Sequence, residues 1–374
     1  MKKLNIKAIL NKMEELGIHQ AGLAKEMGVS RESISQWLKN VKMPRPAYLL
    51  KLATVLEMSF SEIVIKEDPI GTYAYRTHRK AKLNEPRTEK AEVMMDLLDA
   101  IFKEKEPASL LAIPKLESPS LNYDYIQKAA RTIRNLMNLK ETQAVTLKHS
   151  IALMHTFQII LIPVLWTEKG DQALTIHLRK PNQFCLYLNI ETKVCDLTFW
   201  LIHELAHILT PDLPQKEAEQ FADSFAGALL FPQENAKKLG KELSLVSNTG
   251  SQIIRIQKEA TTRSVAPTYI FKEINCYLER NDKPLLDINI FPASTNYRKS
   301  VPLLSDLLFE EKTPSAMQYI EKSSVFFGSA FWDTLTRWLI AQEKTSSTVQ
   351  AVLNIPLIDA KEVYSYLTKK EISD

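Results

Sequence analysis

The sequence predicts a mainly α-helical protein with one small β-sheet, built from an all-α N-terminal unit, an α+β unit and a helical C-terminal region. Apolar residues recur with the spacing of amphipathic helices through most of the chain. Short β-branched and aromatic runs gather within residues 157–190, which limits the sheet to this stretch. The length of 374 residues exceeds that of a typical single domain and favours two or three compact units.

The composition is that of an ordinary soluble globular protein, with 45% hydrophobic and 25% charged residues. No apolar run reaches the roughly 18 residues needed to cross a bilayer. The N-terminus lacks an apolar core of signal-peptide length before Glu14, so we expect a cytoplasmic protein with no membrane partner. The three cysteines (Cys185, Cys195 and Cys276) are too few and too widely spaced for a disulfide framework, and we expect small buried hydrophobic residues there.

The positive charge is concentrated at the start of the chain. Residues 1–65 hold ten Lys and Arg against six Asp and Glu, which accounts for the whole net charge of +4. A basic N-terminal unit on a balanced remainder favours binding to nucleic acid. From charge alone, a solvated lysine-rich face is an equally good interpretation.

The first half of a helix-turn-helix pattern lies in residues 20–28. Leu23, Ala24 and Met27 form an apolar stripe at helical spacing. Gly28 then ends the helix, because glycine adopts a positive φ without steric cost.

A second helix follows after a short turn. Ser30 is a favourable N-cap, and Ile34, Trp37 and Leu38 share one face of the helix. Two helices joined by a turn of three to four residues, the second with a polar leading edge, form the layout that places a recognition helix in the major groove. The alternative is a small structural helical hairpin.

The polar side chains of this pattern are the candidate DNA contacts. Arg, Ser and Gln side chains on the second helix can reach base edges, whereas Lys39, Lys42 and Arg45 are placed to meet phosphates. A single unit of this size buries a modest area on DNA, so we expect a homodimer on a two-fold site in double-stranded DNA. The residues expected to bind DNA are Gln20, Ser30, Arg31, Glu32, Ser33, Gln36, Lys39 and Lys42.

Residues 1–65 resemble the Cro/phage-repressor-like (XRE) family of helix-turn-helix regulators. Asn40 and Val41 stand where that family has a Gly-containing turn, a mild departure because Asn tolerates the left-handed conformation. The resemblance implies DNA binding and regulation of transcription. The matching residues are Gln20, Leu23, Ala24, Gly28, Val29, Ser30, Ile34, Ser35, Trp37, Pro44, Leu52 and Ala53.

Residues 66–119 are expected to connect this head to the rest of the chain. Residues 66–85 are charged and interrupted by Pro69 and Gly71, which predicts a linker or a partly docked connector. An amphipathic helix follows over residues 87–105, and its apolar side faces either a core or a dimer interface.

The α+β unit is expected over residues 120–260. Helices come first, then a small antiparallel sheet, then a strongly apolar helix. The predicted helices cover residues 123–139 and 143–155, the strands residues 157–166, 173–178 and 184–190, and the apolar helix residues 192–209.

The apolar helix carries a candidate metal site. His203 and His207 are four residues apart, so both imidazoles lie on one face of the helix and can reach one ion. Glu204 lies about 100° around the helix axis, near enough to hold a metal-bound water without displacing it. This is the HExxH pattern of zinc peptidases. The alternative is a helix with packed, hydrogen-bonded histidines.

A catalytic zinc ion needs a third protein ligand. A second helix is predicted over residues 215–230, where Glu219 and Asp223 share one face. Glu219 can complete the site, and Asp223 can accept the free N–H of a ligating histidine. Glu217 is the competing third ligand.

These two helices resemble the ImmA/IrrE-type metallopeptidases, a thermolysin-like zincin group. The matching text is FWLIHELAHIL followed by EQFADSFAGALLFP, and the resemblance covers residues 120–260. It implies a zincin-like fold, His203, His207 and Glu219 as ligands of Zn²⁺ (with Mn²⁺ as the alternative ion), and Glu204 as the general base. The group typically cleaves a repressor to release transcription, which implies a repressor-type protein substrate. The segment between His207 and Glu219 is short for the group.

Two features leave alternatives open. The oxyanion of peptide hydrolysis needs a further donor, and His155, His177 and Tyr187 are available, with packing the better interpretation for the two histidines. Residues 261–374 carry no recognisable chemistry and are expected to be interaction or regulatory helices.

The combined prediction is a cytoplasmic DNA-binding regulator with a zinc endopeptidase domain. One alternative is a transcription factor whose zincin-like domain senses a ligand or partner without cleaving it. Another is an antitoxin-like regulator. An intact Glu204 favours the first, because a pure sensor does not need a general base.

Overall fold

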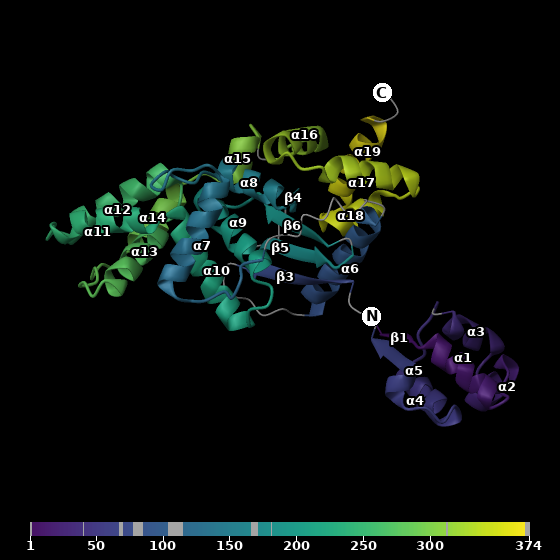
Figure 1. The fold of residues 1–374 in the computed structure, drawn as a ribbon. Coiled ribbons are helices and arrows are strands. Elements are labelled where there is room, and N and C mark those ends of the chain that lie inside the picture. Colours follow the sequence, from purple (N-terminus) through teal and green to yellow (C-terminus); the bar gives the residue numbers. More distant parts are fainter. Residues whose placement is uncertain are drawn as a thin grey trace. The chain divides into compact units, whose positions relative to one another are not determined.

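The structure, a computed structural model, describes residues 2–39, 41–66, 70–77, 85–103, 115–165, 171–180, 182–311 and 313–370. The chain divides into two compact units, Met1–Ile70 and Gly71–Asp374. Each unit has its own hydrophobic core. Figure 1 shows the elements of both units, which are mainly helical with one four-stranded sheet, as the sequence predicts.

Short helices form the N-terminal unit, and a two-stranded ribbon joins its ends. Its elements are β1 (Lys2–Leu4), α1 (Ile6–Glu15), α2 (Gln20–Met27), α3 (Arg31–Leu38), α4 (Pro46–Val55), α5 (Phe60–Ile63) and β2 (Val64–Lys66). Leu23 and Met27 of α2 pack with Ile34 and Trp37 of α3 and with Leu52 of α4 in the core. The ribbon, in which β1 pairs antiparallel with β2, was not predicted, because strands of three residues are too short to show a period.

The sheet lies at the centre of the second unit (Figure 1). Its strands are β3 (Gly71–Thr77), β4 (Ile160–Val164), β5 (Asp171–Leu178) and β6 (Gln183–Asn189), in the order β3-β5-β6-β4. β5 pairs antiparallel with both β3 and β6, whereas β4 pairs parallel with β6. The prediction of an antiparallel sheet is therefore wrong for β4, which pairs parallel with its neighbour. The hairpin of β5 and β6 occupies one side of β6, and β4 lies on the other side in the same direction as β6.

For residues 66–85, the linker interpretation is wrong where β3 forms, and the structure favours the alternative of a partly docked connector there. Pairing with β5 makes this strand part of the second unit's sheet. A side chain at Gly71 would overlap the His177 carbonyl, so glycine permits the close approach of the two strands. Proline and charges nearby favoured a linker, but strand pairing is a long-range contact that local composition does not reveal. Residues 67–69 and 78–84, which the same prediction covers, lie outside the described residues.

The described residues between 85 and 230 contain five helices, and the last two carry the candidate site. They are α6 (Glu85–Phe102), α7 (Tyr123–Leu136), α8 (Leu147–Thr156), α9 (Val194–Leu209) and α10 (Gln215–Leu230). The apolar side of α6, with Leu98, Ile101 and Phe102, is buried in the core of its own unit, which favours the core interpretation over a dimer interface. α9 contacts both α8 and α10.

The C-terminal helices belong to the same compact unit, whereas the sequence predicted separate regions at 120–260 and 261–374. The Tyr319 hydroxyl donates to the carbonyl of Pro163 at 2.6 Å, and the Tyr187 hydroxyl to that of Val352 at 2.9 Å. Of the remaining helices, α11 (Gln233–Ser244) precedes residue 261 and α12 (Thr249–Arg263) extends across it. The helices that follow are α13 (Pro267–Arg280), α14 (Phe291–Ser300), α15 (Leu304–Leu308), α16 (Ala316–Phe327), α17 (Phe331–Ala341), α18 (Ser346–Leu353) and α19 (Leu357–Lys370).

Two expectations from composition can be compared with the structure. Among the described residues, every helix is too short or too polar to cross a membrane. The three cysteines are free; Cys185 and Cys195 are buried, and Cys276 is half-buried.

Candidate metal centre and DNA-binding head

The metal-centre candidate is built on α9, a helix buried on nearly all sides. His203 is 1% exposed and Glu204 is 5% exposed, within a run of buried Phe, Trp, Leu and Ile side chains. Burying polar groups is costly unless they have partners. The partners of these two side chains therefore decide what the helix can do.

The two histidines lie one turn apart with their rings close together. The Nε2 atoms of His203 and His207 are 3.0 Å apart, and the rings meet edge to face. The His207 side chain is 26% exposed, so the pair opens towards solvent at this end.

Glu219 reaches this pair from α10. Its Oε1 lies 3.3 Å from Nε2 of His207, and its Oε2 lies 3.8 Å from Nε2 of His203. The three ligand atoms all lie within 4.8 Å of one another. Glu217, the competing ligand, is exposed on α10 and is absent from this group within the described residues.

Asp223 fixes the orientation of the buried histidine. Its Oδ1 lies 2.9 Å from Nδ1 of His203, one turn beyond Glu219 on α10. This contact leaves Nε2 of His203 facing Glu219 and His207. A carboxylate behind a histidine in this way fixes the ring and raises the basicity of its free nitrogen.

The donor set fits a small divalent ion. Bonds of about 2.0–2.1 Å in a tetrahedral arrangement place donors about 3.3 Å apart. In the structure, the three donor atoms are separated by 3.0, 3.3 and 3.8 Å. The same distances also suit direct hydrogen bonds among the three side chains.

Glu204 has a partner that the sequence did not predict. Its Oε2 accepts a hydrogen bond of 2.7 Å from the hydroxyl of Thr175 on β5. This bond ties α9 to the sheet and fixes the direction of the carboxylate. The strand pattern gave no signal for Thr175, because threonine is common in strands.

Two of the three side chains offered as oxyanion donors, Tyr187 and His177, are engaged elsewhere, whereas His155 is exposed on α8. Tyr187 is fully buried and donates to the Val352 carbonyl. The His177 ring stacks on Phe184, with ring centroids 4.0 Å apart, and its Nε2 lies 2.9 Å from Oδ1 of Asn182.

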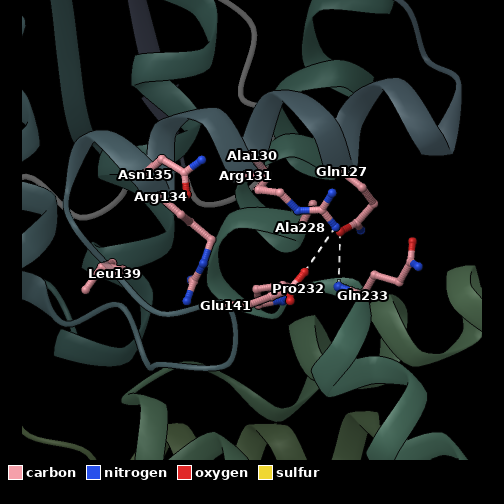
Figure 2. A pocket seen from close by; sticks show the side chains of 10 residues that line it. All are labelled: Gln127, Ala130, Arg131, Arg134, Asn135, Leu139, Glu141, Ala228, Pro232 and Gln233. Atoms are coloured by element: carbon pink, nitrogen blue, oxygen red, sulfur yellow. Dashed lines mark hydrogen bonds and ion pairs between the residues drawn. The ribbon is translucent and has the colours of Figure 1, made fainter.

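A cavity of about 380 Å³ lies apart from the metal-centre candidate, between α7, α10 and the start of α11. Figure 2 shows its charged side chains. Arg131 pairs with Glu141 at 3.1 Å. Arg134 donates to the carbonyls of Leu229 and Lys140 at 2.7 and 2.8 Å. The hydrogen bond from Arg134 to the Leu229 carbonyl joins α7 to α10 beside this cavity.

Burial of Arg134 also affects its protonation equilibrium. Burial and the neighbouring Arg263 lower the pKa of Arg134 to about 10. The guanidinium still carries its charge at neutral pH, and the carbonyl oxygens around it stabilise that charge.

The turn between α2 and α3 has the predicted chemistry. Gly28 adopts the left-handed conformation at φ 66° and ends α2. The Ser30 hydroxyl accepts a hydrogen bond of 3.1 Å from the Ser33 amide and so caps α3. Lys51 of α4 donates to the Met27 carbonyl at 3.2 Å, a contact that the sequence did not suggest.

The predicted DNA-contact residues lie on the outside of this motif. Glu32 and Gln36 face each other on α3, with Nε2 of Gln36 3.4 Å from Oε1 of Glu32. Ser30 is occupied as a helix cap, which favours a structural role for it. The exposed members of the set are Ser30, Arg31, Glu32, Lys39 and Lys42, and the half-buried members are Gln20, Ser33 and Gln36.

Comparison with known proteins identifies the first unit. A family model described as helix-turn-helix matches residues 9–63, in agreement with the XRE-type resemblance. The chain therefore carries a helix-turn-helix of the kind that binds double-stranded DNA in transcription regulators. No curated protein and no solved structure matches the chain.

Proposed function

We propose that the second unit is a zinc-dependent endopeptidase and that the protein cleaves a repressor-type protein to control transcription. The observation that carries this proposal is the meeting of His203, His207 and Glu219 beside the buried carboxylate of Glu204. Two imidazole nitrogens with one carboxylate suit zinc, with manganese as the alternative ion. A homodimer on a two-fold DNA site is part of the proposal.

Different side chains of the protein have different roles in the proposed peptide hydrolysis. Zinc, when bound, supplies a Lewis acid that activates water near neutral pH. Glu204 accepts the proton of the water that attacks the peptide carbonyl and returns it to the leaving amine. Asp223 orients His203, and Thr175 orients Glu204.

Incubation with candidate substrates tests this proposal. The full chain, supplied with zinc or manganese, is mixed with repressor-type proteins from the same cell, and the products are analysed by mass spectrometry. We expect discrete cleavage by the wild type and none by Glu204→Gln. A chain that cleaves no protein and still regulates its genes would support the sensor alternative.

Thr175 provides a prediction about positioning. Replacing Thr175 by Val removes the hydroxyl that donates to Glu204 but keeps the shape of the side chain. Because a misplaced base transfers protons poorly, kcat should fall by about ten- to hundredfold with little change in metal content. Thr175→Ser should restore most of the activity. Equal activities of the Val and Ser variants would contradict this role.

The DNA-binding head provides a second prediction. Arg31→Ala or Gln36→Ala should relax sequence specificity, because these side chains can read base edges from α3. Lys42→Ala should weaken binding to all duplexes alike and reduce the salt slope by about one, because a phosphate contact is lost. Binding curves of the full chain at several salt concentrations measure both effects. Absence of salt-sensitive duplex binding at low ionic strength would contradict the recognition-helix assignment.

A further inference from the structure

A second cavity, of about 360 Å³, adjoins the metal-centre candidate. Asp223, which holds His203, lines this cavity. Phe199, one turn before His203 on α9, also lines it, and the centroids of these two rings are 6.1 Å apart. Asp223 and Phe199 are therefore shared between the surroundings of His203 and the wall of this cavity.

The walls of the cavity are largely apolar. Phe199 stacks on Tyr269, with ring centroids 3.7 Å apart and planes 3° from parallel. Further apolar surface comes from Phe271 of α13, from Ile290 just before α14 and from Phe291 at the start of α14. Such walls suit the alkyl stem of a long side chain.

Glu273 of α13 gives the cavity an unusual polar group. The residue is 4% exposed and lines the cavity. Within the part of the chain that the structure describes, no hydrogen bond or ion pair to its carboxyl is found. Buried polar groups nearly always have partners, so an unsatisfied carboxyl on a cavity wall points to a ligand.

The protein makes room for this carboxyl. A side chain at Gly227 of α10 would overlap Oε1 of Glu273, so glycine allows the carboxyl to lie against the helix backbone. Gly227 lies one turn beyond Asp223 on α10. The carboxyl of Glu273 therefore lies on the same side of α10 as Asp223, which contacts His203. Burial raises the pKa of Glu273 to about 8, so the carboxyl is mostly protonated at neutral pH. A cation that binds beside it favours the ionised form and causes the proton to leave.

The charges around the cavity favour a cation. Asp223, Glu273 and Glu279 line it together with one basic residue, Lys272. Lys272 and Glu279 are exposed, whereas Glu273 is buried. Asp223 and Glu279 outnumber Lys272 and attract a positive charge, and Glu273 pairs with that charge once its own proton has left.

We infer that this cavity receives the basic side chain, Arg or Lys, of the peptide substrate and that Glu273 is its ion-pair partner. Glu273 is then a specificity-determining residue. This inference rests on the proposed peptidase function. On binding, the proton of Glu273 passes to solvent, the carboxylate pairs with the substrate cation, and no covalent bond is formed or broken in this step.

The test uses peptidyl hydroxamates that differ only in the side chain following the zinc-binding group: Arg, norleucine, Gln or Glu. Their dissociation constants are measured by calorimetry on the full chain supplied with zinc. We expect the Arg compound to bind the wild type at least about tenfold more tightly than the norleucine compound, because a desolvated charge pair forms. Glu273→Gln should reduce this preference to within about twofold.

Glu279→Gln is the matched control, because Glu279 lines the same cavity but is exposed. It should keep most of the preference for Arg, since an exposed charge contributes little. Equal binding of the Arg and norleucine compounds to the wild type would overturn the inference without any variant. Persistence of the preference in Glu273→Gln, or equal binding of the Gln and Arg compounds, would overturn it as well.

Failure of the proposed function gives a different result. If none of the four hydroxamates binds, the zinc site is absent, and the inference falls together with it. If the norleucine compound binds with zinc and not without it, the metal centre stands, and only the preference for a cation is under test.

Discussion

Glu204→Gln is expected to lower turnover of a cleavable substrate by about 10²- to 10⁴-fold, because the amide cannot accept the proton of the attacking water. The amide oxygen can still accept the hydrogen bond from Thr175, so the fold around the side chain should persist. The ligand set does not include Glu204, and the metal content should therefore equal that of the wild type. Steady-state kinetics and elemental analysis of the same preparation measure both quantities.

Glu217→Gln is the matched control, since Glu217 is an exposed glutamate on α10 outside the ligand set. It should leave turnover unchanged. In a reporter strain, Glu204→Gln should occupy its operator and fail to switch its target genes. A normal reporter response would contradict the peptidase proposal and favour the sensor alternative, even with zinc bound.

Loss of both histidine ligands is expected to abolish metal binding. Wild type should hold about one zinc ion per chain, and His203→Ala/His207→Ala should hold none, because Glu219 alone cannot retain the ion. Ligands that bind only the folded state stabilise it by about 2.7 kcal/mol at a hundred times the dissociation constant. Zinc should therefore raise the melting temperature of the wild type and not that of the double variant.

The control for this experiment is His177→Ala. His177 lies on β5, stacks on Phe184 and is outside the candidate ligand set. This variant should keep the full metal content and the zinc-dependent rise in melting temperature. Stoichiometric zinc in the double variant would contradict the assignment of the metal centre.

Local features of the sequence predicted the helices of both candidate sites well. Gly28 and Ser30 act as the helix end and the helix cap that their chemistry suggested. α10 covers residues 215–230, the range predicted from its flanking prolines and its apolar pattern. Helix periodicity, caps and breakers act over a few residues, so they can be read along the chain.

Spacing along two helices was also enough to suggest which side chains share a face. His203 and His207 are one turn apart on α9, and Glu219 and Asp223 are one turn apart on α10. Helix geometry puts each pair on one side of its helix. That the two faces meet, with Glu219 against both histidines, is a tertiary contact.

The sequence by itself determined the helix-turn-helix, the positions of α9 and α10 and the residue types of the metal-centre candidate, because these depend on short-range geometry. The tertiary structure alone decided that β3 is a strand, that β4 runs parallel to β6 and that the C-terminal helices share the core. It also decided that Thr175 is the partner of Glu204 and that Glu273 is buried. Strand pairing and burial bring together residues that are far apart in the chain. A local sequence pattern does not indicate which distant residues a strand or a buried side chain will contact.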